Sequence, residues 1–405
     1  MNRIYLDYAA TTPVDEQVLK VMVPYFSEKF GNPMSIHSFG REAEMALERS
    51  RKIVADFLHC LPSEVIFTSG ATESNNLAIK GVIKKYNYSQ PGKKHPLPHI
   101  ITTAFEHHCV LNSIKFLEKS GQAEVAYLPV YKEGIIKIED VKNAIRPNTI
   151  LISVMYVNNE IGTVQPIFRI GKFLKAINAK RNTGGKIIFH TDATQAINYF
   201  DCDVEKIGVD LLSLSGHKIY GPKGVGVLFV KKGTAISRIQ DGGDQEFGLR
   251  AGTHNVPGIV GLAEAIKKIQ DIRNKIQNIV KLRDYLIKKV LKEIPEVNLN
   301  GSRKLRSPNN ANFSFANVEG ESLVLSLDAE GIACSTGSAC STGSLEPSHV
   351  LLAIGLRPEE AHGSLRVSLG KNTTKKEIGI FIMKLKKVVR KLRNVSGSIL
   401  KEFKK

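Results

Sequence analysis

Long apolar runs are missing from this sequence. No stretch of its 405 residues approaches the roughly 18 consecutive apolar residues that a membrane-spanning helix needs. The N-terminus, MNRIYLDYAATTP, has no positively charged region followed by an apolar stretch, so we expect no signal peptide. We therefore expect a soluble, cytoplasmic protein without a membrane partner.

Cysteine is scarce, with five residues: Cys60, Cys109, Cys202, Cys334 and Cys340. An odd count without a secretion signal indicates a reducing compartment, in which thiols serve packing or chemistry. Only Cys334 and Cys340 share a polar, small-residue stretch, ACSTGSACSTGS. The other three stand in apolar or helical surroundings, and we predict that they are packing residues.

Acidic residues are outnumbered: 57 Lys and Arg face 39 Asp and Glu, a formal net charge of +18. Such a charge raises the question of nucleic-acid binding. The lysines are dispersed and no recognition motif is present, so we do not predict a nucleic-acid partner. The densest basic run, Lys384 to Lys405, fits an amphipathic helix, for which a solvated face is favoured over an acidic protein partner.

Short apolar runs are the main structural signal. With 42% hydrophobic residues the chain can bury a large core, and its length suggests two domains. Runs typical of buried strands lie at 64–69, 99–104, 125–130, 150–157, 186–191, 210–215 and 225–230, and helical patterns such as 41–59 and 170–180 separate several of them. This alternation predicts an α/β fold with a mostly parallel, seven-stranded sheet covered on both faces.

The pattern changes after about residue 258. A long charged helix is expected at 259–293, followed by a few short strands, the cysteine stretch and the basic helix. We therefore predict a large domain at 15–258 and a smaller α+β domain formed by 1–14 and 259–405. Ligands of such sheets bind beyond the carboxyl ends of the strands, so residues at those ends are the candidates for function.

The segment SLSGHKIYGPKGVG (213–226) places Lys218 at a strand end, beside His217. A desolvated lysine there can act as an amine nucleophile, and a lysine Schiff base is how pyridoxal phosphate (PLP) is held. Asp192, in FHTDATQA 26 residues earlier, could pair with the pyridinium nitrogen of PLP, and Gln195 could bond its ring oxygen. Taken singly, a surface lysine and a helix-capping aspartate remain alternatives.

The segment TSGATES (68–74) opens a helix directly after a strand. Free backbone N–H groups and the helix dipole bind a phosphate at such a place, Gly70 permits close approach, and Thr72 adds a hydroxyl. A plain helix cap explains the segment equally well in isolation. The phosphate turn, the aspartate and Ser-x-His-Lys, each at a strand end and in this order, together favour a PLP site.

Longer motifs extend this interpretation across the chain. GATESNN, EHH, VNNEIG, HTDATQ, SGHKIYGPKG, RAGT, GSACSTGSLEPSHV and SLRVSLG resemble the cysteine desulfurases of iron–sulfur cluster and nitrogenase maturation. These enzymes are fold-type I PLP proteins of the class V aminotransferase superfamily. The resemblance covers nearly the whole chain, from YLDYAATTP to about Ser398.

The resemblance implies a cofactor site for PLP. Its residues would be Ala71, Thr72, Asn159, Asp192, Gln195, Ser215, His217, Lys218 and Thr253. Lys218 would form the Schiff base, and His107 would stack on the ring as an acid–base group. Thr253 would reach the phosphate of a neighbouring subunit, which implies a homodimer. Asn159 and Arg366 would hold the carboxylate of the substrate, L-cysteine.

The same resemblance implies an activity in which L-cysteine becomes L-alanine and its sulfur forms a persulfide on Cys340. A sulfur-acceptor or iron–sulfur scaffold protein would take the sulfur for cluster assembly or other sulfur-containing cofactors. No metal site is expected, apart from Cys340 as a transient iron–sulfur ligand. The sequence ends with LRNVSGSILKEFKK, where many members have a longer scaffold-binding tail, which leaves docking there open.

Several alternatives stay open at this point. Of the adjacent His107 and His108 only one can face the ring, and position favours His107. An internal Asp or Glu, instead of the substrate, could pair with Arg366. Cys334 stands where the family has serine or alanine, and is expected to be a bystander more than a relay or resolving thiol.

Rival functions are a selenocysteine lyase or cysteine sulfinate desulfinase, a class V aminotransferase, and an inactive PLP fold that binds a partner. The presence of Lys218, Asp192 and His107 argues against the last of these.

Overall fold

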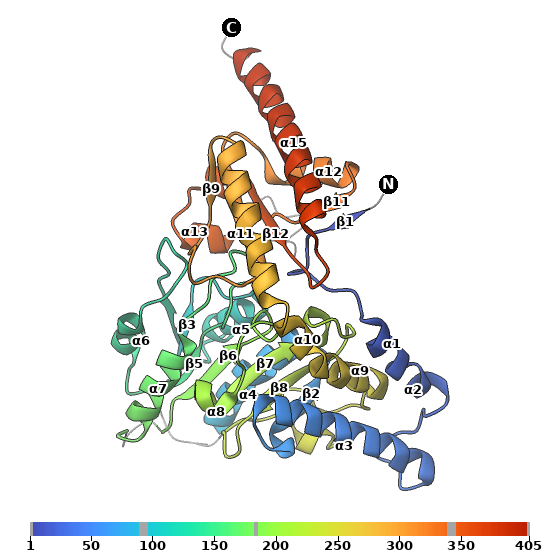
Figure 1. The fold of residues 1–405 in the computed structure, drawn as a ribbon. Coiled ribbons are helices and arrows are strands. Elements are labelled where there is room, and N and C mark those ends of the chain that lie inside the picture. The colour runs from blue at the N-terminus through green and yellow to red at the C-terminus, as the bar shows by residue number, and fades with distance from the viewer. Residues whose placement is uncertain (1–2, 89–95, 182–184, 338–345, 403–405) are drawn as a thin grey trace.

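The computed structural model describes residues 3–88, 96–181, 185–337 and 346–402, and side chains as far as 395. Two bodies are stacked in it (Figure 1): a large sheet with its helices below, and a smaller unit above, from which the last helix runs away toward the C-terminus. Within the described residues, no helix combines the length and the apolar character needed to cross a membrane.

The strands are β1 (Ile4–Tyr5), β2 (Val65–Thr68), β3 (His99–Thr103), β4 (Glu124–Leu128), β5 (Thr149–Ser153), β6 (Ile188–Asp192), β7 (Leu211–Ser215), β8 (Gly226–Val230), β9 (Val297–Leu299), β10 (Asn310–Phe315), β11 (Ile332–Ala333) and β12 (Ser364–Ser368). The main sheet has seven strands in the order β2-β8-β7-β6-β5-β3-β4. Neighbours from β7 to β4 are parallel, and only β8 runs antiparallel to the others. The predicted mostly parallel, seven-stranded sheet is confirmed.

The helices are α1 (Glu16–Met22), α2 (Pro24–Ser27), α3 (Ser38–Leu58), α4 (Ala71–Tyr88), α5 (His108–Lys119), α6 (Ile138–Ala144), α7 (Ile167–Asn178), α8 (Val204–Ile207), α9 (Val256–Lys267), α10 (Ile269–Arg273), α11 (Ile276–Glu293), α12 (Gly320–Ala329), α13 (His349–Ala353), α14 (Pro358–His362) and α15 (Lys375–Glu402). Among the described residues, short 3₁₀ turns lie at Pro62–Glu64, Gly216–Lys218 and Glu246–Gly248.

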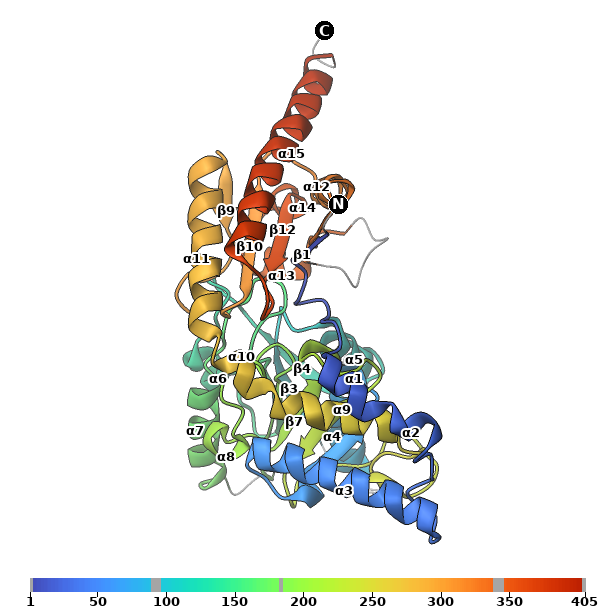
Figure 2. The same cartoon turned by 45° about the vertical axis from the view of Figure 1, so that its right-hand side comes forward.

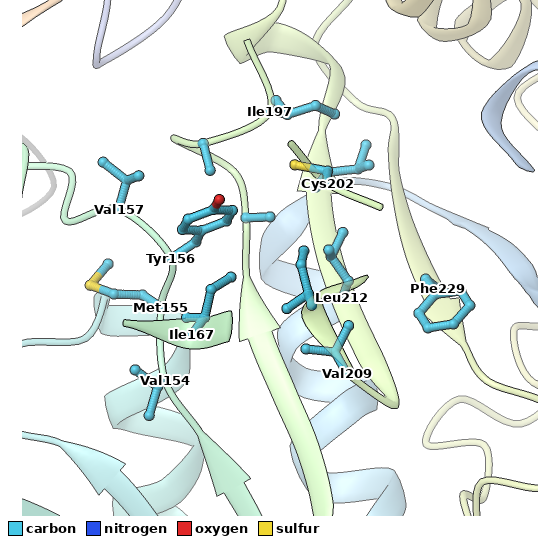
Figure 3. Close-up of a cluster of buried hydrophobic side chains, with 14 of the residues drawn as sticks. Val154, Met155, Tyr156, Val157, Ile167, Ile197, Cys202, Val209, Leu212 and Phe229 are labelled. Carbon is cyan, nitrogen blue, oxygen red and sulfur yellow. The ribbon is translucent and has the colours of Figure 1, made fainter. Parts of the chain in front are cut away.

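Alternate residues of the strands enter two different cores, because successive side chains of a strand point to opposite faces. One face, with Phe67, Ile152 and Phe189, packs against α3, α7 and α9. Part of this cluster, including Val154, Ile167 and Leu212, is shown in Figure 3. The other face, with Ile66, Leu151 and Ile188, packs against α4 and α5. Both faces are therefore covered, as the near-continuous apolar runs predict.

The smaller unit has a core of its own. The antiparallel sheet β12-β10-β9 packs with α11, α12 and α15, and the N-terminal Ile4 and Leu6 belong to the same cluster. In Figure 2, α11 and α15 stand side by side above the large body. Because the first residues of the chain join this cluster, it favours the grouping of 1–14 with the C-terminal part.

The expected helix at 259–293 is wrong as a single element. The chain forms α9, α10 and α11 there, with breaks at Lys268 and at 274–275. The physical reason is that α9 buries Ile259 and Leu262 in the core of the large sheet, whereas α11 buries Ile279 and Leu286 in the smaller core. The domain division stays a prediction, and these clusters favour a boundary near 274 over one at 258.

The strand directions bring distant segments together. Since β2, β3, β5, β6 and β7 all run the same way, their last residues lie along one edge of the sheet. β8 begins at that edge with Gly226. The segments that follow these strands contain the residues predicted to carry chemistry.

Candidate active site

A cavity of about 510 Å³ opens at this edge of the sheet. The predicted residues that line it are Ala71, Thr72, His107, Asn159, Asp192, Gln195, Ser215, His217, Lys218 and Arg366. Thr253 is exposed and is not in the lining, and its contact with a neighbouring subunit stays a prediction. Cys340 lies outside the described residues. Ten residues from six separate segments thus meet in one place.

The turn between β2 and α4 forms one wall. Gly70 has φ +151°, in the region that favours glycine, and α4 begins at Ala71 immediately after it. A Cβ on Gly226 of β8 would lie 2.7 Å from the Gly70 Cα, so the turn is packed closely against that strand. The N-terminus of an 18-residue helix therefore points its free N–H groups and dipole at the cavity, as an anion site requires.

Asp192 is the last residue of β6 and is 6% exposed. Its Oδ2 accepts a hydrogen bond from Asn75 Nδ2 at 2.7 Å, and its Oδ1 accepts one from the Thr194 N–H at 2.9 Å. The residues that follow form turns and not a helix, so Asp192 is not a helix cap. Sequence reasoning missed Asn75, although the motif GATESNN contains it one helical turn beyond the phosphate turn.

Lys218 follows β7, and its amine points at the N-terminal segment of the chain. Its Nζ donates hydrogen bonds to the carbonyls of Ala9 and Ala10, both at 2.6 Å, and Gln195 Nε2 donates to the Ala9 carbonyl at 2.9 Å. Lys218 is half-buried in the cavity, so it is not an ordinary surface lysine. The adjacent His217 is kept neutral, because burial and the nearby cation of Lys218 lower its pKa to about 4.

His107 is the N-cap of α5. Its Nδ1 accepts a hydrogen bond from the Cys109 N–H at 3.2 Å, which leaves Nε2 as the nitrogen that carries the proton in the neutral ring. Burial, opposed by the charge of Asp192, lowers its pKa. His108 does not line the cavity; its ring packs against that of His349, with centroids 4.6 Å apart. The geometry favours His107 as the histidine of the site.

Cys109 was predicted to be a packing residue, but it lines the cavity. Its Sγ lies 3.0 Å from His107 Nδ1 and 3.0 Å from Asn75 Nδ2. Burial raises its pKa to about 12, so the group stays a thiol at neutral pH. It can orient His107 but is not an activated nucleophile.

Arg366, on β12, is 2% exposed and has an internal carboxylate as a partner. Its Nη2 donates to Asp7 Oδ1 at 2.8 Å, and its Nη1 donates to the Asn159 carbonyl at 2.9 Å. Arg366 therefore has an internal Asp as a partner, which was the alternative to a substrate carboxylate. Among the described residues, Arg366 Nε and Asn159 Oδ1 are buried without a hydrogen-bond partner, so the cavity still offers a donor and an acceptor to a ligand.

Cys334 belongs to the core of the smaller unit and is 8% exposed. Burial raises its pKa to about 12, which disfavours the nucleophilic thiolate. Its role as a bystander stays a prediction that these surroundings favour. In the described part of the chain, no cluster of His, Cys, Asp and Glu has an arrangement that could bind a metal ion.

The residues present fit PLP. The cavity combines a lysine amine, a buried carboxylate and a helix N-terminus, which match the aldehyde, the pyridinium nitrogen and the phosphate of that group. The Thr194 Oγ1 is also buried without a partner among the described residues. Asp7 and Asn75 belong to the site although sequence reasoning assigned them no role; both stand in quoted motifs, which was the available signal.

Comparison with known proteins places this geometry in a family. The model of the class-V aminotransferase family matches residues 4–381. A cysteine desulfurase IscS from Dictyoglomus turgidum is 51% identical over 396 residues, which make up 98% of this chain and 96% of that protein. A solved NifS-like protein is 36% identical with a TM-score of 0.86, over 96% of this chain and 100% of that one.

A second solved structure, described as SspA in complex with cysteine, is 39% identical with a TM-score of 0.77, over 92% of this chain and 100% of that one. The chain therefore belongs to the class-V aminotransferase family, and within it to the cysteine desulfurases. The predicted fold class, a fold-type I PLP enzyme, and the predicted class of enzyme are confirmed.

His190, two residues before Asp192, is expected to make the free energy of unfolding of the protein depend on pH. It is fully buried between Ser153 Oγ at 2.8 Å and Ser213 Oγ at 3.1 Å, and burial lowers its pKa from 6.5 to about 4. Between these two pH values His190 binds a proton in the unfolded chain but not in the folded one. Its contribution to the free energy of unfolding is therefore fully present above pH 6.5 and is lost as the pH falls toward 4.

We expect His190→Gln to reduce this fall by about 3 kcal/mol at most. Urea unfolding of both proteins at pH 7 and pH ~4.5 measures it, with the exposed His362→Gln as the matched control. An identical pH dependence in His190→Gln and the parent would contradict the assignment.

Proposed function

We propose that this protein binds PLP and converts L-cysteine to L-alanine, with the sulfur retained as a persulfide on Cys340. The observation that carries the proposal is the meeting of Lys218, Asp192 and the N-terminus of α4 in one cavity. The relatives named cysteine desulfurase and the solved relative in complex with cysteine support the substrate.

The residues of the cavity take distinct roles in this proposal. PLP, when bound, supplies an electron sink that stabilises negative charge on the substrate carbon. Lys218 binds the aldehyde of PLP and accepts the α-proton of the substrate, and Asp192 holds the pyridinium nitrogen protonated. Arg366 and Asn159 bind the carboxylate of L-cysteine, and His107 moves a proton at its Nε2.

The transfer of sulfur to Cys340 needs no additional oxidant or reductant. The Cys340 thiolate attacks the sulfur of L-cysteine, an S–S bond forms and the C–S bond breaks. The electron pair of the broken bond goes to the substrate carbon, which takes a proton and leaves as L-alanine. A sulfur-acceptor or iron–sulfur scaffold protein then receives the outer sulfur, and Cys340 could serve as a transient ligand of the iron–sulfur cargo.

The direct test supplies L-cysteine to the purified enzyme and measures alanine and protein-bound persulfide in the same sample. We expect equal amounts of both in a single turnover without reductant. Equivalent assays with L-selenocysteine and L-cysteine sulfinate separate the neighbouring activities. Alanine without a persulfide would overturn the sulfur-carrier role.

We also propose a cytoplasmic homodimer, and an apolar surface on α1 to α3 supports the dimer. Its exposed residues are Leu19, Val23, Phe26, Phe30, Met34, Ile36, Phe39 and Met45. Monomers rarely expose so many large apolar side chains in one short segment such as 19–45, and Ile36 is 91% exposed. In Figure 2, α2 and the start of α3 project from the large body, where a second subunit can reach them.

We expect a mass close to twice 44.7 kDa in sedimentation or light scattering. The double variant Phe30→Glu/Ile36→Glu should shift the protein toward monomer, because association would bury two carboxylates in an apolar interface. Lys52→Glu, at an exposed and charged position of the α3 helix that follows Phe30 and Ile36, serves as the control. A fully active wild-type monomer would refute both the dimer and the contact of Thr253 with a neighbouring subunit.

A further inference from the structure

The free edge of β2 is covered by side chains. β2 lies at the end of the main sheet and pairs only with β8 among the described strands, so its outer N–H and C=O groups need other partners. Glu246 Oε2 accepts the Phe67 N–H at 2.6 Å, and Arg51 Nη1 donates to the Val65 carbonyl at 2.6 Å. Two ionic side chains thus satisfy the outer hydrogen-bonding groups of β2, the strand that leads into the turn between β2 and α4, which is the anion-binding turn.

These side chains form a buried cluster away from the catalytic groups. Glu246 is 4% exposed and accepts hydrogen bonds from Arg51 at 2.8 and 2.9 Å and from His254 Nε2 at 2.8 Å. The Arg51 guanidinium carbon lies over the rings of Phe67 and Phe247, 4.9 and 5.0 Å from their centroids. Burial alone would raise the pKa of Glu246, but the bonds from Arg51 and His254 outweigh it and lower the pKa, so the carboxylate is ionised.

The backbone that presents Glu246 is strained. Glu246 has φ +49° and Phe247 has φ +56°, a left-handed backbone conformation that residues with a Cβ rarely adopt. Strain of this kind persists only where surrounding contacts determine the conformation. Here the left-handed pair points Glu246 into the cluster and turns the chain so that Arg250 faces α4.

Arg250 makes a second contact with the same turn. Its Nε donates to Glu73 Oε1 at 2.9 Å, and Glu73 Oε2 accepts the Ser69 N–H at 2.6 Å. Burial opposes ionisation of Glu73, but the bonds from Ser69 and Arg250 lower its pKa. Glu73 lines the cavity, so a carboxylate charge stands beside the place proposed for a phosphate.

We propose that the loop 246–250 positions the anion-binding turn, and that Arg250 neutralises the negative charge of Glu73 so that this turn can bind a phosphate. Glu246 fixes the strand before the turn, and Arg250 fixes the first turn of the helix after it. Without Arg250 the unpaired Glu73 carboxylate would repel a phosphate dianion across the cavity. The inference rests on the proposed function, because it takes the phosphate of PLP as the ligand of the turn.

The test removes PLP from the purified enzyme and measures the rebinding of PLP and of pyridoxal, which lacks the phosphate. For Arg250→Met we expect the dissociation constant of PLP to rise about 10-fold or more and that of pyridoxal to stay within about 2-fold. Inorganic phosphate should also compete less well with PLP in this variant. Arg238→Met is the matched control, because its carboxylate partners Asp241 and Asp244 belong to the same loop region and not to the turn.

A double variant separates charge neutralisation from a general loss of structure. If Arg250 acts through Glu73, Arg250→Met/Glu73→Gln should regain most of the affinity for PLP, since a neutral amide does not repel phosphate. Arg250→Lys should rescue part of it. Equal losses for PLP and pyridoxal, or no recovery in the double variant, would overturn the inference. Failure of the wild-type protein itself to bind PLP would instead overturn the proposed function.

Discussion

Replacing Lys218 by alanine is expected to abolish the absorbance of the Schiff base between PLP and this lysine, and all measurable turnover. The absorbance near about 400 nm arises from PLP joined to a lysine amine, and Lys218 is the half-buried amine that lines the cavity. Loss of a group that both holds the cofactor and moves the α-proton should lower the rate by at least about 10³-fold. Spectra of the purified variant and an assay of alanine from L-cysteine measure the two effects.

A matched control is available on the neighbouring strand. Lys231 follows β8 and pairs with the exposed Glu205 at 3.0 Å, so Lys231→Ala removes a lysine without touching the cavity. We expect this control to keep its colour and its activity. Retained colour with normal alanine production in Lys218→Ala would show that another amine holds PLP.

The second large effect concerns the two cysteines of the ACSTGSACSTGS stretch. We expect Cys340→Ser to bind PLP and L-cysteine with unchanged affinity, yet to form no persulfide, because only the extraction of sulfur needs this thiol. The loss of sulfur transfer should exceed about 10³-fold, since a positioned nucleophile is removed. Rapid-scan spectra should show early changes on addition of L-cysteine and then no further progress.

Cys334→Ser is the companion variant and should keep most of the activity under reducing conditions. Its thiol is buried in the core of the smaller unit, where its raised pKa of about 12 keeps it protonated. Mass spectrometry after a single turnover locates the added sulfur on one cysteine or the other. An inactive Cys334→Ser with an active Cys340→Ser would reverse the assignment, and two inactive variants would favour a relay between both thiols.

The main sheet could be predicted from the sequence because its strands are short apolar runs, which fit only strands buried on both faces. Strands such as 225–230 are apolar on both faces because both faces are covered, and this alone distinguishes them from the strands of a half-exposed sheet. The segment 259–293 could not be divided in the same way. Its apolar spacing is helical throughout, and only the change of packing partner between α9 and α11 breaks it.

The amino-acid sequence by itself determined the chemical groups of this protein: a lysine, an aspartate and a glycine turn at strand ends, in motifs long enough to identify the family. The tertiary structure alone decided which groups face one another. It gave Arg366 an internal partner in Asp7, brought Asn75 against Asp192, and set Arg250 on Glu73. Those contacts join residues up to 359 positions apart, and no local pattern reports them, because such distant segments meet only after the strands have paired into sheets.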